Sequence, residues 1–167
     1  MNRNYPNTEI VGNVVVFGGR GSPLSNFYKS VFADKENRMY YSVEQYFQYR
    51  KALYFKDFVM ADKIKEAKTP VEAKRLGGRV KNFDEKKWDD VKFDIMLEEL
   101  TLKFQSLPFK SILEDYYIDT STLIRRVFLE NTGNMYWGGS INITTGRIQG
   151  KNYLGKLLNK LASQLFE

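Results

Sequence analysis

The sequence predicts a helix-rich α+β fold in a single compact domain. Apolar residues recur at helical spacing in several segments, and the longest of these runs near residues 85–105. Short β-branched runs indicate a few strands near the N-terminus and around residues 122–129. The length of 167 residues suits one domain with a sizeable core, and no repeat, low-complexity tract or linker interrupts the chain.

The N-terminal quarter is expected to supply most of the strands. Residues 1–12 are polar, so we expect a flexible N-terminus followed by one domain over residues 13–167. Residues 14–17 are a predicted strand, and a hairpin is expected over 31–41 with its turn at 34–37. The intervening loop Gly18-Gly19-Arg20-Gly21 can cradle a phosphate. It lacks the end of a P-loop and the Rossmann spacing, so a simple turn explains the bare motif better.

The segment that begins at Ser42 has the most chemical content. Ser is a favourable N-cap, and Gln45 stands three residues later, as in a capping box. Glu44, Gln48 and Lys51 follow at helical spacing, so a carboxylate, an amide and an amine share one stripe of the predicted helix. Such a stripe is most often a solvated face, so this segment alone does not define a site.

Further helices are expected along the rest of the chain. Their signals are N-cap residues, proline in a first turn, glycine at an end, and apolar stripes. The predicted spans are 55–67, 69–78 after Thr69, 85–105 after Asp84, 108–115, and a final helix capped by Asn152 or a neighbour.

Residues 130–150 form a long turn-rich stretch around Tyr136-Trp137-Gly138-Gly139. Such a loop in a compact domain is more often functional than idle. Trp137 either presents its ring to a ligand or anchors the loop as a buried ring, and the sequence leaves both readings open.

Composition excludes several kinds of chemistry. The chain has no cysteine and no histidine, which removes disulfides, thiolate and Ser-His catalysis and most zinc sites. Acid–base work must then fall to Asp, Glu, Lys, Tyr or water. The net charge of +6 fits either a lysine-rich surface or a phosphate-rich partner. No apolar run suits a membrane span and no signal-peptide pattern is present, so we expect a cytoplasmic location without membrane contact.

Several segments in order resemble the YbiA-like or NADAR domain family. Each is weak alone, but the ordered set is specific and covers nearly the whole chain. Three positions depart from the family pattern: Gln45 replaces a His, and Asn134 and Gly139 each replace an Asp. The matching segments are Ser25-Asn26-Phe27-Tyr28, Glu44-Gln45-Tyr46-Phe47-Gln48 with Lys51, Thr69-Pro70, Ala73-Lys74, Leu76-Gly77, Arg79, Trp88, Met96, Lys103-Phe104-Gln105, Tyr136-Trp137-Gly138 and Gly150-Lys151-Asn152-Tyr153-Leu154-Gly155.

The resemblance implies a small N-glycosidase that cleaves a ribosyl C–N bond without a metal or redox cofactor. It implies two substrate classes. One is ADP-ribose attached to a nucleobase, notably guanine, including ADP-ribosylated DNA or RNA. The other is the phosphorylated ribosylaminopyrimidine intermediates of riboflavin synthesis. A module that binds ADP-ribose or nucleic acid without cleaving it is the alternative from another class.

Two residues are the predicted catalytic groups. Breaking a ribosyl C–N bond builds positive charge on the sugar, which a carboxylate stabilises, and Glu44 is the candidate. Lys51 can attack an opened sugar aldehyde as a neutral amine and form a Schiff base. The resemblance supports Lys51, whereas the spacing shows only that it can share a site with Glu44.

The predicted binding residues fall into three groups. Aromatic rings supply a stacking surface, because stacking a base on a ring is worth roughly 1–3 kcal/mol. Backbone amides and cations hold phosphates, and short polar side chains bind ribose hydroxyls. The set is Tyr136 and Trp137 for stacking, Arg20, Gly21, Lys151 and Asn152 for phosphates, Ser25 and Asn26 for ribose, and Phe27, Gln48 and Gly138 beside them.

Overall fold

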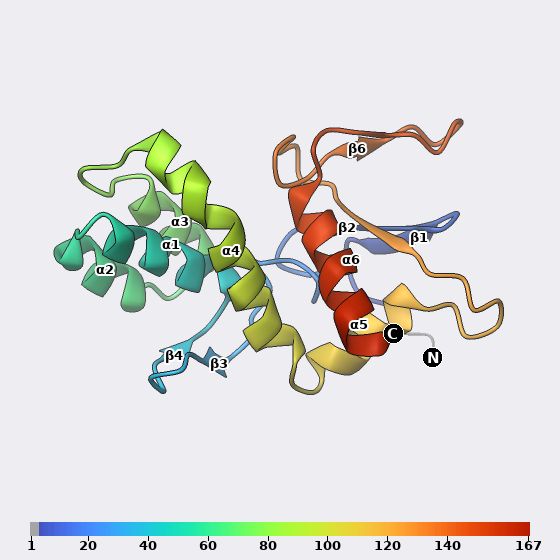
Figure 1. Cartoon of the computed structure of the whole chain (residues 1–167), viewed down its shortest axis with the longest axis horizontal. Helices are drawn as coiled ribbons and strands as arrows, with labels where there is room; N and C mark the ends of the chain where they lie inside the picture. The colour runs from blue at the N-terminus through green and yellow to red at the C-terminus, as the bar shows by residue number, and fades with distance from the viewer. Residues whose placement is uncertain (1–3) are drawn as a thin grey trace. The chain divides into compact units, whose positions relative to one another are not determined.

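The computed structural model describes residues 4–167, which form six helices and seven short strands (Figure 1). The predicted helix-rich α+β class is confirmed. The chain divides into two compact units. One combines the N-terminal segment up to Tyr28 with Phe104–Glu167, and the other is Lys29–Lys103. That residues 13–167 act as a single domain stays a prediction. No helix in the described part is long and apolar enough to cross a bilayer.

The first unit is built on a three-stranded sheet in the order β1-β2-β5, formed by β1 (Thr8–Val11), β2 (Val14–Phe17) and β5 (Val127–Glu130). β1 runs antiparallel to β2, and β5 runs parallel to it. Residues 8–11 thus form a strand, which corrects the expectation that they belong to a flexible N-terminus. The strand predicted near 122–129 begins later, at Val127, and Leu123 within the predicted span adopts a positive φ of 58°.

Helix α6 (Tyr153–Phe166) packs against β5, and α5 (Phe109–Tyr117) packs against α6. Two asparagine side chains tie α6 to β5. The Asn152 amide donates to the Phe128 carbonyl at 2.7 Å, and its carbonyl accepts from the Glu130 N–H at 3.3 Å. Asn159 accepts from the Phe128 N–H at 2.9 Å. These bonds satisfy strand groups that have no further strand to pair with.

The loop region between β5 and α6 is more ordered than the sequence indicates. It contains a short hairpin of β6 (Ser140–Ile141) and β7 (Ile148–Gln149). Two glycines allow this loop to pack closely against the backbone of the rest of the unit. A Cβ on Gly138 would lie 2.3 Å from the Glu130 carbonyl oxygen, and one on Gly139 would lie 2.1 Å from that of Gln149. Only glycine permits these backbone approaches.

The second unit consists of a β3–β4 hairpin (Phe32–Ala33 and Met39–Tyr40) and four helices. The helices are α1 (Val43–Tyr54), α2 (Phe58–Lys65), α3 (Pro70–Gly77) and α4 (Glu85–Phe104, whose last residue falls in the first unit). α1 packs against both α2 and α3. The predicted hairpin, the N-caps Ser42, Thr69 and Asp84, and the long helix are confirmed. The helix predicted from residue 55 begins only at Phe58, because Asp57 caps it and Lys56 has a positive φ.

Gln45 forms more bonds than a capping box would give it. Its N–H donates to the Ser42 hydroxyl at 3.1 Å, as predicted. Its side-chain carbonyl accepts from the Tyr41 N–H at 2.8 Å, one residue before the position a capping box uses. Its side-chain amide donates to the carbonyls of Ile64 and Lys65 at the end of α2. This residue therefore ties α1 to the end of α2.

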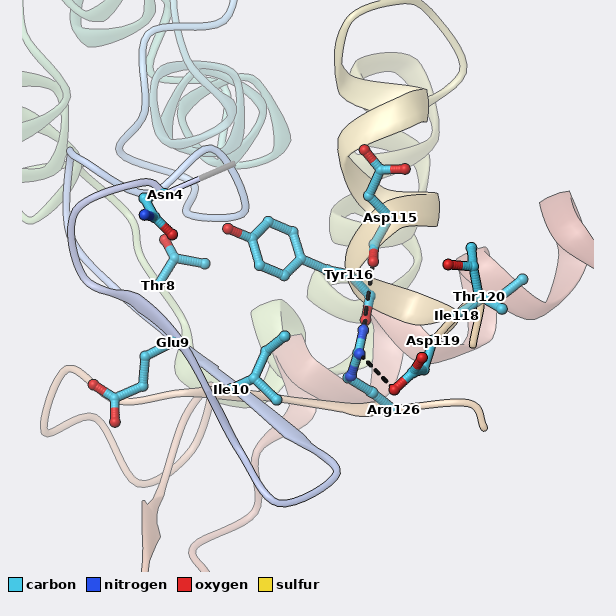
Figure 2. Close-up of a pocket in the computed structure, with 10 residues that line it drawn as sticks. All are labelled: Asn4, Thr8, Glu9, Ile10, Asp115, Tyr116, Ile118, Asp119, Thr120 and Arg126. Carbon is cyan, nitrogen blue, oxygen red and sulfur yellow. Dashed lines mark hydrogen bonds and ion pairs between the residues drawn. The ribbon is translucent and has the colours of Figure 1, made fainter. Parts of the chain in front are cut away.

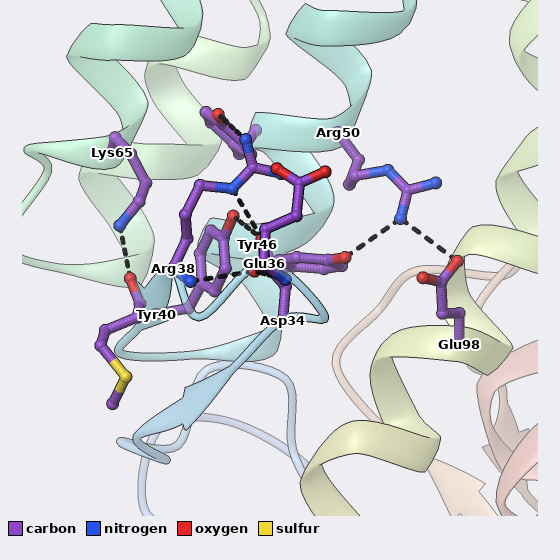
Figure 3. A network of polar contacts seen from close by, with 10 residues as sticks. Asp34, Glu36, Arg38, Tyr40, Tyr46, Arg50, Lys65 and Glu98 are labelled. Carbon is purple, nitrogen blue, oxygen red and sulfur yellow. Dashed lines mark hydrogen bonds and ion pairs between the residues drawn. The ribbon is translucent and has the colours of Figure 1, made fainter.

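A polar network supports the hairpin and the outer side of α1 (Figure 3). The Asp34 carboxylate accepts from Arg38 at 2.8 Å and from the Tyr40 hydroxyl at 2.9 Å. Burial alone would raise the pKa of Asp34, but these hydrogen bonds outweigh it and lower the pKa to about 2. Further along α1, Arg50 donates to the Tyr46 hydroxyl at 3.1 Å and pairs with Glu98 of α4 at 3.2 Å.

The asparagine clamp generates a stability prediction. Asn152→Ala should lower the free energy of unfolding by about 1–3 kcal/mol, because two buried backbone groups of β5 lose their partners. Asn152→Gly tolerates the positive φ of 49° but also removes the amide, so it should recover only part of the loss. Urea unfolding checks this, with exposed Lys160→Ala as the control. Equal stability of Asn152→Gly and the wild type would show that the clamp contributes nothing.

Candidate functional site

Glu44 and Gln48 form a buried polar pair on α1. The Gln48 side-chain amide donates to the Glu44 carboxylate at 2.8 Å, across one helical turn. Only 7% of Glu44 and 8% of Gln48 is exposed, so the predicted stripe is not a solvated face. Burial raises the pKa of Glu44, while the Gln48 hydrogen bond and the charges of Lys74 and Lys51 oppose that rise. Because the carboxylate is shielded from water, its electrostatic attraction to a cationic centre is stronger than it would be in solution.

Lys51 lies one turn beyond Gln48 and is half-buried. Its ammonium sits 4.6 Å from the centroid of the Phe83 ring and forms no ion pair within residues 4–167. Burial lowers the pKa of Lys51, and the charge of Glu44 opposes this. The amine and the carboxylate are thus near each other without direct pairing, which is the arrangement that a nucleophilic amine requires.

Helix α3 contacts the Gln48 side chain of this pair through Gly77. A Cβ added to Gly77 would lie 1.8 Å from the Gln48 side-chain oxygen and 2.4 Å from its amide carbon. The Gln48 amide therefore occupies the space of the missing side chain. That oxygen has no hydrogen-bond partner in the described part of the chain. The contact between α1 and α3 holds the Gln48 amide in its position toward Glu44.

Helix α4 contributes two buried ionisable residues that the sequence analysis did not select. Glu99 is 0% exposed and Lys103 is 1% exposed. With Ile95 they form one buried row at intervals of four residues. Burial lowers the pKa of Lys103 to about 7. The apolar pattern of α4 could not reveal a glutamate and a lysine as core residues. The sole sequence signal was the place of Lys103 in a matching segment.

In the first unit, the predicted stacking rings are partly exposed. Tyr136 and Trp137 meet edge to face at 5.1 Å between centroids, and Tyr136 meets Tyr153 at 4.8 Å. The Lys151 ammonium lies 5.5 Å from the centroid of Tyr136. The structure thus brings Tyr136, Trp137 and Lys151 into one cluster of rings with a cation, and Trp137 is not a fully buried anchor.

Two departures from the family pattern have structural explanations. The side-chain oxygen of Asn134 accepts from the N–H groups of Tyr136 and Trp137, both at 2.9 Å. An amide oxygen fills this turn-capping role as a carboxylate oxygen would. Gly139 lies too close to the Gln149 carbonyl for any side chain. In this protein both positions therefore shape the loop.

The remaining predicted binding residues lie in several settings. Ser25 and Asn26 are buried in successive turns, where the Ser25 hydroxyl accepts from the half-buried Phe27 N–H at 3.1 Å.

Arg20 is exposed and forms no polar contact within residues 4–167, whereas Gly21 lies against Pro6. A pocket of about 420 Å³ adjoins this loop. It is lined by Gly18 and Gly19 rather than by Arg20 and Gly21, together with Asn7, Glu9, Val16, Phe17, Asn131 and Thr132.

Asn152 does not need a ligand to explain it, because both of its side-chain polar atoms bind the backbone of β5. It stands at the N-cap position of α6, but its side chain does not cap the helix. A substrate-binding role for Asn152 stays a prediction without structural support.

Figure 2 shows a second pocket of the first unit, about 440 Å³ in volume. Its arginine, Arg126, already pairs with Asp119 at 3.1 Å and donates to the Tyr116 carbonyl at 3.1 Å. The other charged groups that line it, Glu9 and Asp115 among them, are acidic. This pocket therefore does not suit a phosphate-bearing substrate, and it contains no residue that the sequence analysis selected.

Comparisons with known proteins agree with this architecture. The family model of the NADAR domain matches residues 17–166. An N-glycosidase of Acanthamoeba polyphaga mimivirus is 34% identical over 82% of this chain and 81% of its own length. N-glycosidase YbiA of Escherichia coli strain K12 is 30% identical over 73% of this chain and 68% of its own length. The riboflavin biosynthesis protein PYRR of Zea mays is 32% identical over 85% of this chain but only 23% of its own length.

The fold agrees as well. The NMR structure of E. coli YbiA superposes with a TM-score of 0.69 and 26% sequence identity, covering 96% of this chain and 89% of that one. The family match spans both compact units and includes the Glu44 helix and the Trp137 loop. The chain therefore belongs to the NADAR domain family.

Proposed function

We propose that this protein is an N-glycosidase that cleaves a ribosyl C–N bond, and that its substrate is ADP-ribose joined to a nucleobase, with guanine as the preferred base. Relatives named N-glycosidase support the reaction class. The resemblance of the ordered motifs supports the ADP-ribosyl guanine substrate. The observation that carries the proposal is the buried Glu44 carboxylate, which accepts a hydrogen bond from Gln48 at 2.8 Å, with the Lys51 amine about two turns further along α1.

The chemistry follows from what each group does to the sugar. As the C–N bond breaks, positive charge develops on C1 and the ring oxygen, and the Glu44 carboxylate stabilises it. Glu44 must be ionised for this role. Burial raises the pKa of Glu44, but the Gln48 hydrogen bond and the charges of Lys74 and Lys51 lower it and so favour the ionised form. The freed C1 then reacts with water. In the alternative route, the neutral Lys51 amine attacks C1 while the base leaves with the bonding electrons of the C–N bond and takes up a proton. The sugar ring then opens to give a Schiff base between C1 and Lys51, and water hydrolyses this Schiff base to release ADP-ribose.

A second substrate class is supported by one relative. The maize protein PYRR is named for riboflavin biosynthesis, so a phosphorylated ribosylaminopyrimidine is the other candidate substrate. A panel of ADP-ribosyl nucleosides and ribosylaminopyrimidine phosphates, followed by mass spectrometry of the released base, separates the two. Measurable affinity for ADP-ribosyl compounds without release of any base would instead identify a binding module.

Substitution of the central carboxylate is the first test. Glu44→Gln preserves size and hydrogen bonding but removes the charge, so kcat should fall about 10²-fold or more while substrate affinity changes little. Base release under single-turnover conditions measures this, with the exposed Glu66→Gln as the control. Near-normal turnover of Glu44→Gln on every accepted substrate would refute the assignment.

The second test uses a matched pair of glycines at the end of α3. Gly77→Ala should lower kcat about tenfold, because the new methyl group displaces the Gln48 amide from Glu44. A Cβ on Gly78 meets nothing closer than 3.4 Å, so Gly78→Ala should remain active. Thermal melts monitor folding, since alanine itself favours the helix. Equal activity of the two variants would show that the position of Gln48 is unimportant.

The third test addresses Lys51. Borohydride added during turnover should trap an adduct of ADP-ribose mass on Lys51, and Lys51→Met should abolish it while exposed Lys86→Met should not. Burial lowers the pKa of Lys51, so the neutral fraction and the trapping rate should rise with pH and level off below the usual lysine value of 10.5. Absence of any adduct during turnover would exclude the Schiff base and leave direct hydrolysis by water.

A further inference from the structure

Residues 131–166 of the first unit contain no aspartate and no glutamate. The segment contributes four of the six net positive charges of the chain, so the charge is concentrated rather than spread evenly. All four cations are exposed, and none forms an ion pair within residues 4–167. A surface of one sign without counter-charges attracts a polyanion. The four cations are Arg147, Lys151, Lys156 and Lys160.

The glutamates on either side of this segment do not neutralise its cations. Glu130, which precedes the segment, is only 8% exposed and accepts from the Thr132 hydroxyl at 3.3 Å. Glu167, which follows it, accepts from Arg125 at 3.0 Å and from the Tyr117 hydroxyl at 2.7 Å. Both carboxylates are therefore engaged away from the four cations.

The backbone fixes the places of these cations on two adjoining elements. The β6–β7 hairpin leads directly into α6 (Figure 1). The Arg147 carbonyl accepts from the Asn142 N–H at 2.9 Å and closes the hairpin turn, and the Lys151 N–H donates to the Met135 carbonyl at 2.8 Å. Lys156 and Lys160 are four residues apart, so they lie on one side of α6. The opposite side of α6 packs against β5.

Aromatic rings hold two of the ammonium groups without neutralising them. The Lys151 ammonium lies 5.5 Å from the centroid of Tyr136 and 6.0 Å from that of Tyr153. The Lys156 ammonium lies 5.4 Å from the centroid of Tyr153. A ring attracts a cation but has no net charge, so both ammonium groups keep their full charge for an anion. Because the rings restrict these side chains, less conformational entropy is lost when an anion binds.

A nucleic-acid strand fits this surface better than a membrane does. A helix that binds a membrane surface inserts its apolar side, but the apolar side of α6 packs against β5. In the hairpin turn Ile143 is exposed, but its exposed neighbours Asn142, Thr144 and Thr145 are polar. Cations interleaved with aromatic rings are the pattern that binds a single strand, since phosphates meet the cations and unpaired bases meet the rings.

We propose that Arg147, Lys151, Lys156 and Lys160 form a strand-binding surface that holds the phosphate backbone of a single-stranded nucleic acid. The inference rests on the proposed function in one respect, because the bound strand is the polymer that contains the ADP-ribosylated base. Contacts to phosphates position a strand without reading its sequence, so the surface accepts strands of any sequence. The enzyme then prefers a base within a strand over the same base in a free nucleoside.

Binding of an unmodified single strand tests the surface without any turnover. The fluorescence anisotropy of a labelled thymidine oligonucleotide of about 20 nucleotides gives the affinity at several salt concentrations. Four phosphate contacts predict a slope of about −3 in the logarithm of the binding constant against the logarithm of the salt concentration. Replacing Lys156 and Lys160 together by Gln should reduce the size of this slope by about 1.4 and weaken binding about tenfold at roughly 0.1 M salt.

A second pair of lysines is the matched control. Lys86→Gln combined with Lys87→Gln removes the same charge from exposed positions of α4, so the affinity and the slope should stay near those of the wild type. Equal weakening in both double variants, or an unchanged slope in both, would overturn the proposal. So would tighter binding of a duplex of the same length, or binding to anionic phospholipid vesicles without binding to the oligonucleotide.

Turnover separates the surface from the reaction. The Lys156→Gln, Lys160→Gln double variant should raise KM about tenfold for an oligonucleotide that contains ADP-ribosyl guanine, with kcat unchanged and with KM unchanged for free ADP-ribosyl guanosine. Normal release of guanine from the free nucleoside without any affinity for oligonucleotides would overturn the surface and leave the proposed function intact. If no substrate releases a base, the proposed function fails while the anisotropy measurement still decides the surface.

Discussion

The hydrogen bond from Gln48 to Glu44 is the interaction on which the candidate site depends. It provides a nearly inaccessible carboxylate with a partner that carries no charge, so Glu44 keeps its own charge available for a substrate. A lysine in the place of Gln48 would form an ion pair and consume that charge. Two neighbouring residues of the second unit support this bond. Gly77 leaves room for the Gln48 amide, and Gln45 ties α1, which carries Glu44 and Gln48, to the end of α2.

The ionisable residues of the second unit are graded by depth. Lys51 is half-buried, Glu44 is nearly covered, and Glu99 and Lys103 are fully buried. Desolvation opposes charge more strongly with depth, so the outer groups can carry charge while the inner ones favour their neutral forms. A protein without histidine thereby obtains groups that titrate away from their usual ranges, as neutral-pH chemistry requires.

The first unit relies on close backbone approach. Gly138 and Gly139 bring the Trp137 loop against the backbone at Glu130 and Gln149, and a Cβ on Gly155 would lie 2.1 Å from the Phe128 carbonyl. The Asn134 side chain accepts from the N–H groups of Tyr136 and Trp137. The side chains of Asn152 and Asn159 bind the backbone of β5. Amide side chains suit these places because they both donate and accept without adding charge.

The sequence alone determined the helix-rich class, the caps at Ser42, Thr69 and Asp84, and the grouping of Glu44, Gln48 and Lys51 on one helix. These features depend on spacing and on bonds between near neighbours, which a linear pattern contains. Only the tertiary structure decided that this stripe is buried, that β1 pairs with β2, and that Glu99 and Lys103 belong to the core. The reason is that desolvation and strand pairing depend on segments distant in sequence, and a glutamate in a helix has the same local pattern whether water or another helix covers it.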